Sequence, residues 1–319
     1  MALLLAGGDD DPNLVALANV AAKAGVELLE LRIPSGESPA FCWNPAEGAP
    51  HLSGRELKPS GAFVRYDVFA GMKDPRPAVN SRALAWYQTF MGWLLSEPRI
   101  RIFNRDLSQI ATNKPASLVH AREAGLSIPA TLVTNEVERF GAGNLDSLVA
   151  KPVSGGDYCH PLAGALNKAE LRGGLAATPA IVQERLVPPE VRIYVIGQFA
   201  FAFEVRSSSL DYRVNQDAEL ILLPEVPKEL CMLRKLMSRL EMDFGAADFK
   251  THPDTGQLLF LELNSSPMFA RFDQVSGGQL CAAIIHELTQ KKALLSPGPS
   301  TQSPGWRRPG CVYAPKCEV

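Results

Sequence analysis

The first thirty residues place an amphipathic stretch between two apolar runs. Residues 2–8 (ALLLAGG) are an uninterrupted apolar run of strand length, which predicts a buried first strand. Apolar positions at helical spacing follow Asp11–Pro12, a pair that favours a helix start, and Gly25 marks the end of this helix. Residues 27–33 return to a strand pattern. The order strand, helix, strand predicts the βαβ opening of an α/β domain.

Further along the chain, helical and strand patterns alternate. Apolar residues recur at helical spacing in three more segments, which predicts helices over Ser81–Leu95, Lys228–Glu241 and Gly277–Thr289. Strand-like runs precede and follow Gly197–Gln198, and a glycine in the first position of a two-residue turn favours a type II′ hairpin. Residues 293–319 are rich in Pro, Ser and Gly, which predicts a flexible tail.

Composition narrows the classes of function. The chain has 319 residues with 46% hydrophobic and 21% charged residues, as in ordinary globular proteins. A net charge of −2 argues against general binding to nucleic acid or to a membrane surface. The N-terminus lacks the basic region of a secretory signal, no apolar stretch could span a bilayer, and the six cysteines form no CxxC motif. A cytoplasmic protein is therefore expected.

Two carboxylates and an amide fall on one predicted hairpin near the C-terminus. The apolar run Leu258–Leu263 reads as a strand, and the segment FGAADFK reads as its partner across a turn rich in Pro, Asp and Gly. Strict alternation puts Phe260, Glu262 and Asn264 on one face, with Asp248 opposite Glu262 or one diagonal step away. Unpaired charges are costly there, so a hard divalent cation with oxygen ligands, such as magnesium, is the expected partner.

Upstream residues could hold the rest of a nucleotide. Lys114 lies near the start of one predicted helix. Lys151 ends a strand just before Ser154–Gly155–Gly156, where backbone N–H groups could approach phosphate oxygens, although such a pattern alone is usually a solvated turn. His160, beyond this loop, could touch phosphate or lie on a polar surface.

The segment IVQERL could hold an adenine through its backbone and apolar side chains, with Gln183–Glu184 leading to Leu186. Glu190 and Arg192 follow at alternating positions, so both side chains face one side, and they suit a ribose hydroxyl and a phosphate or carboxylate. Arg206 ends the returning strand; standing alone, such arginines are more often surface residues.

From Lys114 to Pro267, the order, spacing and type of these residues resemble the ATP-grasp superfamily of carboxylate ligases. The similar groups within it are the ribosomal-protein S6 glutamate ligase and the microviridin-type (graspetide) peptide ligases. The segments EVRIYVIGQFAFAFEVR and LELNSSP carry the resemblance, and Asp248 stands at the first metal aspartate. The chain departs from the pattern in its short loop SGGDYC and at Met268, where the family often has glycine.

The resemblance implies an α/β fold with an α+β lid. Its parts are an N-terminal α/β domain (1–105), a central lid (106–182), a C-terminal domain with an antiparallel sheet (183–292) and the tail. It also implies roles for the residues above. In these roles, ATP phosphates are bound by Lys114, Lys151, Gly155 and Gly156, adenine by Gln183, Glu184 and Leu186, and the ribose by Glu190. Magnesium (or manganese) is bound by Asp248, Glu262 and Asn264. The transferring phosphoryl group is stabilised by Arg192 and Arg206.

The implied reaction converts a carboxylate into an acyl phosphate with ATP, and an amine or hydroxyl then displaces phosphate. Positioning and charge neutralisation suffice for such chemistry, which agrees with the lack of a Ser–His–Asp or Cys–His arrangement in the sequence. The carboxylate could belong to a ribosomally made peptide; the alternatives are a ligase acting on a small molecule or protein tail, and a non-catalytic ATP sensor. Arg213 could contact the acceptor or form a surface pair with Asp211. A homodimer is one assembly that the resemblance implies.

Overall fold

The computed structural model describes residues 2–34, 38–46, 48–140, 143, 145–154, 158–207, 209–210 and 218–290. Two compact units divide the described residues: one joins the residues up to Arg105 with residues 268–290, and the other is Asp106–Pro267. The expected division into an N-terminal domain, a lid, a C-terminal domain and a tail stays a prediction; Gly155, Gly156, Arg213 and the tail lie outside the described residues. Among the described helices, none is long and apolar enough to cross a membrane.

The first unit is built on a three-stranded parallel sheet in the order β2-β1-β6. Asp11 accepts the backbone N–H of Asn13 and caps the helix that joins the first two strands, and Pro12 opens that helix. The predicted βαβ opening is therefore confirmed. The bounds are β1 Ala2–Gly8, α1 Pro12–Lys23, β2 Glu27–Ile33 and β6 Gly61–Val64.

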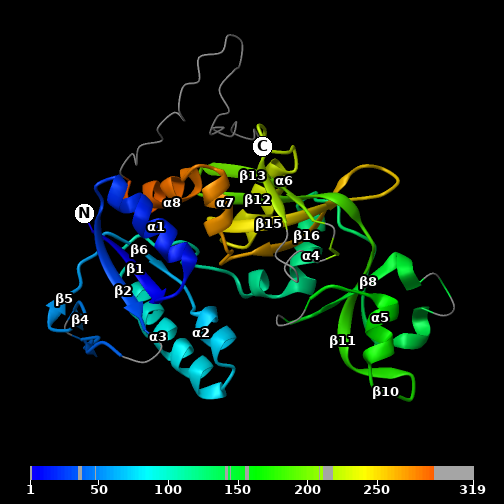
Figure 1. Ribbon diagram of the computed structural model, residues 1–319, viewed down its shortest axis with the longest axis horizontal. Helices are drawn as coiled ribbons and strands as arrows, with labels where there is room; N and C mark the ends of the chain where they lie inside the picture. The colour runs from blue at the N-terminus through cyan, green and yellow to red at the C-terminus, as the bar shows by residue number, and fades with distance from the viewer. Residues whose placement is uncertain are drawn as a thin grey trace, which may run out of the picture. The chain divides into compact units, whose positions relative to one another are not determined.

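Helices cover this sheet (Figure 1). Phe90 and Trp93 of the predicted long helix pack against Leu4 and Leu29 of the sheet, and the last helix contacts the first one. A small antiparallel sheet lies in a segment that the sequence presents as polar and turn-rich. The bounds are α2 Val68–Lys73, α3 Pro77–Ser96, α7 Ala270–Val275, α8 Gln279–Thr289, β3 Phe41–Cys42, β4 His51–Leu52 and β5 Arg55–Glu56.

The second unit contains a five-stranded antiparallel sheet in the order β14-β13-β12-β15-β16. Val191 and Ile193 face the core beneath two helices, which contribute Leu118 and Leu236 to it. Gly197 takes a φ of 52° in the two-residue turn between β12 and β13, as a type II′ hairpin requires. The bounds are β12 Val187–Ile196, β13 Phe199–Arg206, β14 Glu219–Leu222, β15 Phe244–Thr251, β16 Leu258–Asn264, η1 Gln109–Thr112, α4 Lys114–Glu123 and α6 Leu230–Arg239.

A second five-stranded sheet completes this unit, in the order β10-β11-β8-β9 with β7 paired to β11. Ala150 and Val182 face one short helix, which covers them with Leu162 and Leu166. Alternate residues of the same strands therefore face away from that helix. The bounds are β7 Thr131–Glu136, η2 Val137–Phe140, η3 Leu145–Ser147, β8 Leu148–Pro152, β9 His160–Pro161, α5 Leu162–Lys168, β10 Leu171–Arg172 and β11 Leu175–Glu184.

The β15–β16 hairpin confirms one expectation and corrects another. Asp248 pairs directly with Glu262, as expected. The register then shifts, so that Phe249 pairs with Phe260 and Leu261 is the extra residue of a β-bulge. Phe260 is consequently buried in the core under the helices, and its predicted place on the face of Glu262 is wrong.

Candidate functional site

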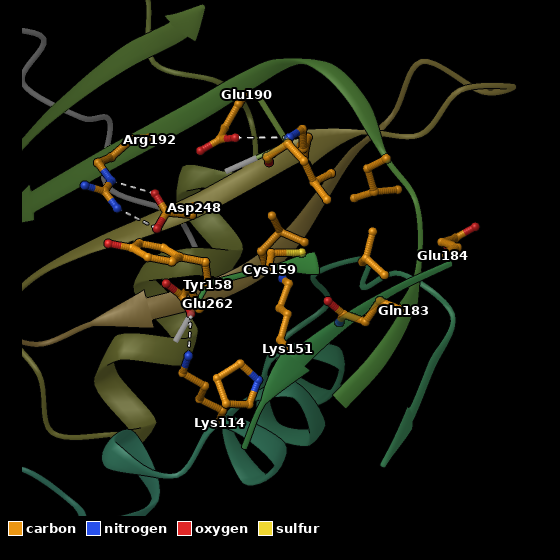
Figure 2. Close-up of a pocket in the computed structure, with 16 residues that line it drawn as sticks. Lys114, Lys151, Tyr158, Cys159, Gln183, Glu184, Glu190, Arg192, Asp248 and Glu262 are labelled. Carbon is orange, nitrogen blue, oxygen red and sulfur yellow. Dashed lines mark hydrogen bonds and ion pairs between the residues drawn. The ribbon is translucent and has the colours of Figure 1, made fainter. Parts of the chain in front are cut away.

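One pocket of the second unit gathers nine of the eleven described residues that the sequence singles out (Figure 2). The space between its walls is about 790 Å³, open solvent at the mouth included. Both sheets and α4 contribute to its lining. Its residues are Lys114, Val149, Lys151, Pro152, Tyr158, Cys159, Gln183, Glu184, Leu186, Glu190, Arg192, Leu210, Asp248, Lys250, Leu261 and Glu262.

Strands β12 and β15 bring an arginine and an aspartate face to face. Arg192 pairs with Asp248 across the two strands, and both are more than nine-tenths buried. The guanidinium donates from Nε to Oδ1 at 2.6 Å and from Nη2 to Oδ2 at 2.7 Å. This two-point geometry is the strong form of an arginine–carboxylate bond, and it fixes the orientation of the Asp248 carboxylate.

Strand β16 adds the second carboxylate and an amide. The Asn264 amide lies 3.4 Å from Asp248 Oδ2 and 3.3 Å from Glu262 Oε1. Lys114 Nζ lies 3.2 Å from Glu262 Oε2, because the first turn of α4 faces this strand. The carboxylates of Asp248 and Glu262 and the Lys114 ammonium therefore meet on one side of the pocket (Figure 2), and the Asn264 amide contacts both carboxylates.

Strands β8 and β11 supply the opposite side. Lys151 pairs with Ile181, and Val149 with Gln183, so alternate side chains of both strands line the pocket. Gln183 is 2% exposed, and its Nε2 donates to Thr131 at 3.0 Å. Its Oε1 is buried without a hydrogen-bond partner within the described structure. Leaving such an acceptor unpaired is costly, so this oxygen is a natural partner for a ligand that donates a hydrogen bond.

At the end of β11 and just beyond it, the pocket is lined by backbone and apolar groups more than by free charges. Glu184 Oε1 accepts the N–H of Ala130 at 2.8 Å, and Glu184 Oε2 lies 3.5 Å from Nε2 of His252. Leu186 is buried at the pocket wall. The Glu184 carboxylate is thus occupied by its own unit, and a flat aromatic ligand would meet the backbone and Leu186 here.

Burial and neighbouring charges shift three pKa values. Burial acts to raise the pKa of Glu262, but Lys114 and Lys151 outweigh it and hold this pKa below its usual value. Burial lowers the pKa of Lys151, although the nearby Cys159 and Glu262 act to raise it. Burial and the Asp248 carboxylate raise the pKa of Glu190. Glu262 is therefore set to remain ionised, as a metal ligand must be.

Other residues of interest lie elsewhere. Arg206 is outside the described lining of the pocket and pairs with Glu204 at 2.6 Å, with over half of its side chain exposed. Asn264 is not among the described lining residues, and its Nδ2 donates to the carboxylates of Asp248 and Glu262, which are. His160 lies on β9 and does not contribute to the described lining.

Seven lining residues were not among the sequence candidates: Val149, Pro152, Tyr158, Cys159, Leu210, Lys250 and Leu261. Lys250 follows Asp248 by two positions on β15, a spacing that could have identified it. Tyr158 and Cys159 reach the pocket because β9 pairs with β8, a long-range pairing without a local signal. Leu210 follows β13 and lines the pocket beside Lys250. The Nζ of Lys250 donates to the Leu210 carbonyl at 3.3 Å.

The donor set fits a hard divalent cation that is bound together with phosphates. Within the described part of the chain, no group of three or more His, Cys, Asp and Glu side chains could hold a metal by itself. Asp248 and Glu262 offer two carboxylates, and the Asn264 amide, whose Nδ2 donates to both here, would offer its oxygen after a half-turn of the amide group. Magnesium is usually held by one or two carboxylates, waters and substrate phosphates, so this smaller set is sufficient for it.

The fold is that of the ATP-grasp ligases, as the comparison with solved structures shows. The expected fold class is therefore confirmed. No protein-family model matches the chain, and no curated protein matches it.

Three solved structures illustrate the likeness. ATP-grasp ligase PsnB, complexed with a minimal precursor, Mg and ADP, has a TM-score of 0.68 at 23% identity, over 90% of this chain and 98% of its own. Macrocyclase MdnC from Microcystis aeruginosa MRC, bound with precursor peptide MdnA, has a TM-score of 0.65 at 19% identity, over 90% and 99%. VanG D-Ala:D-Ser ligase from Enterococcus faecalis has a TM-score of 0.57 at 13% identity, over 92% and 99%.

Proposed function

We propose that this protein is an ATP- and magnesium-dependent ligase that activates a carboxylate of a ribosomally made peptide for attack by an amine or hydroxyl. The observation that carries the proposal is the meeting of Asp248 and Glu262 with Lys114, Lys151 and Arg192 in one pocket. The peptide substrate is favoured because PsnB and MdnC, which have the same fold, are complexed with precursor peptides.

In this proposal, different residues of the pocket bind the adenine, the ribose, the phosphates and the magnesium of ATP. Gln183 Oε1 accepts a hydrogen bond from the adenine amino group, the backbone near Glu184 and Leu186 meets the ring, and Glu190 meets the ribose. Lys114 and Lys151 neutralise phosphate oxygens, and backbone N–H groups of Gly155 and Gly156 donate hydrogen bonds to them. Asp248, Glu262 and Asn264 hold magnesium (or manganese), which neutralises charge that develops on the phosphates when it is bound.

Activation requires no nucleophile from the protein. A substrate carboxylate oxygen attacks the γ-phosphorus, and the bond to the leaving ADP oxygen breaks, which gives an acyl phosphate. An amine or hydroxyl then attacks the acyl carbon, phosphate leaves with the C–O bond electrons, and the nucleophile loses its proton. Arg192 stabilises the transferring phosphoryl group. Arg206 is assigned the same role by the resemblance, and it must leave Glu204 to take it.

The test is ADP release in the presence of Mg²⁺ and a candidate peptide, the product of a short gene beside this one that is rich in Asp, Glu, Lys, Ser or Thr. Hydroxylamine traps the acyl phosphate as a hydroxamate, and mass spectrometry detects the loss of water for each bond formed. The Glu262→Ala variant is expected to fold normally. Its rate of ADP release should be at least about 100-fold lower than that of the wild type, because a charge-stabilising contact is removed.

The matched control is Glu225→Ala, which changes an exposed glutamate of the same unit and should leave ADP release unchanged. Undiminished ADP release by the Glu262→Ala variant would rule out the metal role of Glu262. If the chain binds ATP tightly without releasing ADP, the sensor alternative is favoured; turnover with a small acid instead of a peptide favours the small-molecule ligase.

A further inference from the structure

A second ion pair lies beside the Arg192–Asp248 pair in the pocket. Glu190 pairs with Lys250 in the register of β12 and β15, two positions along from Arg192 and Asp248. All four side chains line the pocket. The signs alternate, so each carboxylate faces a cation on the neighbouring strand, which is the favourable cross-strand arrangement.

Lys250 forms an ion pair with Glu190 inside the pocket. Its Nζ lies 3.3 Å from Glu190 Oε2, and the two side chains are only 12% and 16% exposed. The same Nζ donates to the Leu210 carbonyl at 3.3 Å. An ammonium carries three N–H donors, and these two contacts leave one for a ligand in the pocket.

The chemistry of this pair matches a vicinal diol. Each hydroxyl of a diol can donate one hydrogen bond and accept others, whereas a carboxylate only accepts and an ammonium only donates. A carboxylate and an ammonium at 3.3 Å therefore offer complementary partners to two adjacent hydroxyls. Arg192 is committed to Asp248 at two points, so it is not the donor for this purpose.

We infer that Lys250, together with Glu190, binds the ribose diol and makes the pocket selective for ribonucleotides over 2′-deoxyribonucleotides. The inference rests on the proposed nucleotide site and adds a residue and a specificity to it. A purely structural role of Lys250 would be to neutralise the buried Glu190, which would then bind the ribose alone; such a role predicts that replacing Lys250 leaves the ratio between the affinities for the ribonucleotide and the 2′-deoxyribonucleotide unchanged.

Calorimetric titration with ADP and 2′-deoxyADP in the presence of Mg²⁺ separates the two roles without any carboxylate substrate. The wild type is expected to bind ADP about 10-fold more tightly than 2′-deoxyADP, since a hydrogen bond to a charged group has this order of strength. In Lys250→Met, ADP affinity should fall about 10-fold and the ratio between the nucleotides should drop below about 3. Lys250→Arg, which keeps the charge and the donors, should restore most of the ratio.

Lys235→Met is the matched control, because Lys235 is an exposed lysine on α6 of the same unit, and both constants should remain at wild-type values. A Lys250→Met variant that keeps the wild-type ratio overturns the inference, as does a wild type that binds both nucleotides equally; the nucleotide site itself survives either result. A wild type that binds no ADP overturns the proposed function and the inference together. Should Lys250→Met not fold, the double variant Glu190→Gln/Lys250→Met, which leaves no buried charge unpaired, is compared with Glu190→Gln. An equal ratio between the nucleotides in these two variants overturns the inference.

Discussion

Three carboxylates of the pocket already have a cation beside them. Asp248 is paired with Arg192, Glu262 with Lys114, and Glu190 with Lys250. A buried carboxylate without such a partner would cost several kcal/mol, of the order of 3–5 when one partner of a buried pair is removed. The same cations that suit phosphate oxygens therefore also stabilise the unit in the absence of a nucleotide.

A buried aspartate of the first unit gives a pH-dependent prediction. Asp273 of α7 is 6% exposed and accepts the Cys281 N–H at 2.8 Å. Burial raises the pKa of Asp273, against the hydrogen bonds from Cys281. As pH rises from about 4, the unfolded state loses this proton before the folded state does, so ionisation of Asp273 destabilises the fold.

In Asp273→Asn this penalty is absent. The difference in urea midpoint between the variant and the wild type is therefore expected to shift in favour of the variant as pH rises from about 4 to 8. Urea unfolding followed by circular dichroism at several pH values measures it. A difference that stays flat, or that shifts toward the wild type, would contradict the cause assigned to the pKa shift.

At the scale of single residues, the sequence showed which charged side chains belong to the site better than it showed which residues line the pocket. Asp248, Glu262 and Arg192 could be singled out because charged side chains in apolar strands require partners. Lys250 was missed although it lies two positions from Asp248 on the same strand. Cys159 could not be found, because it reaches the pocket through the pairing of Ala150 with His160, and that pairing has no signature in either segment.

Close packing between a strand and a helix gives a prediction at the scale of elements. A Cβ atom on Gly61 of β6 would lie 2.2 Å from the Leu288 carbonyl oxygen at the end of α8. Backbone atoms cannot move aside cheaply, so Gly61→Ala is expected to destabilise the first unit by about 1–3 kcal/mol. Urea unfolding of the purified variant measures the change.

Gly92→Ala is the matched control for this substitution. Gly92 is exposed in α3, and a Cβ atom there would meet nothing within 4 Å. Alanine is the better helix former by about 1 kcal/mol, so this variant should be equally or more stable than the wild type. If Gly61→Ala is as stable as Gly92→Ala, the approach of α8 to β6 is looser than the structure shows.

Elements with regular periodicity were predictable, and the irregular one was not. The opening βαβ unit and the faces of β12 follow from period 3.6 and period 2, and the structure has both. Phe260 was placed on the wrong face because a bulge at Leu261 interrupts the alternation of β16. A bulge is a property of two paired strands, so the pattern of one strand does not reveal it.

At the scale of the whole molecule, all described residues that line the pocket belong to the unit Asp106–Pro267. A ligand that binds only the native state stabilises what it binds, by about 2.7 kcal/mol at a hundred times its dissociation constant. The segments that line the pocket should therefore gain most from bound nucleotide. These segments are α4, β8, β11, β12, β15 and β16.

Hydrogen exchange measured with and without Mg-ADP tests this expectation. Amides of β8, β11, β12 and β15 should exchange more slowly with the nucleotide, because opening of these strands must first release it. Amides of β1, in the sheet of the other unit, should change much less, and Mg²⁺ without ADP should reproduce little of the effect. Slowing that is equal in both units, or confined to the first, would mean that the nucleotide acts on the whole chain or binds elsewhere, and the assignment of the pocket would fail.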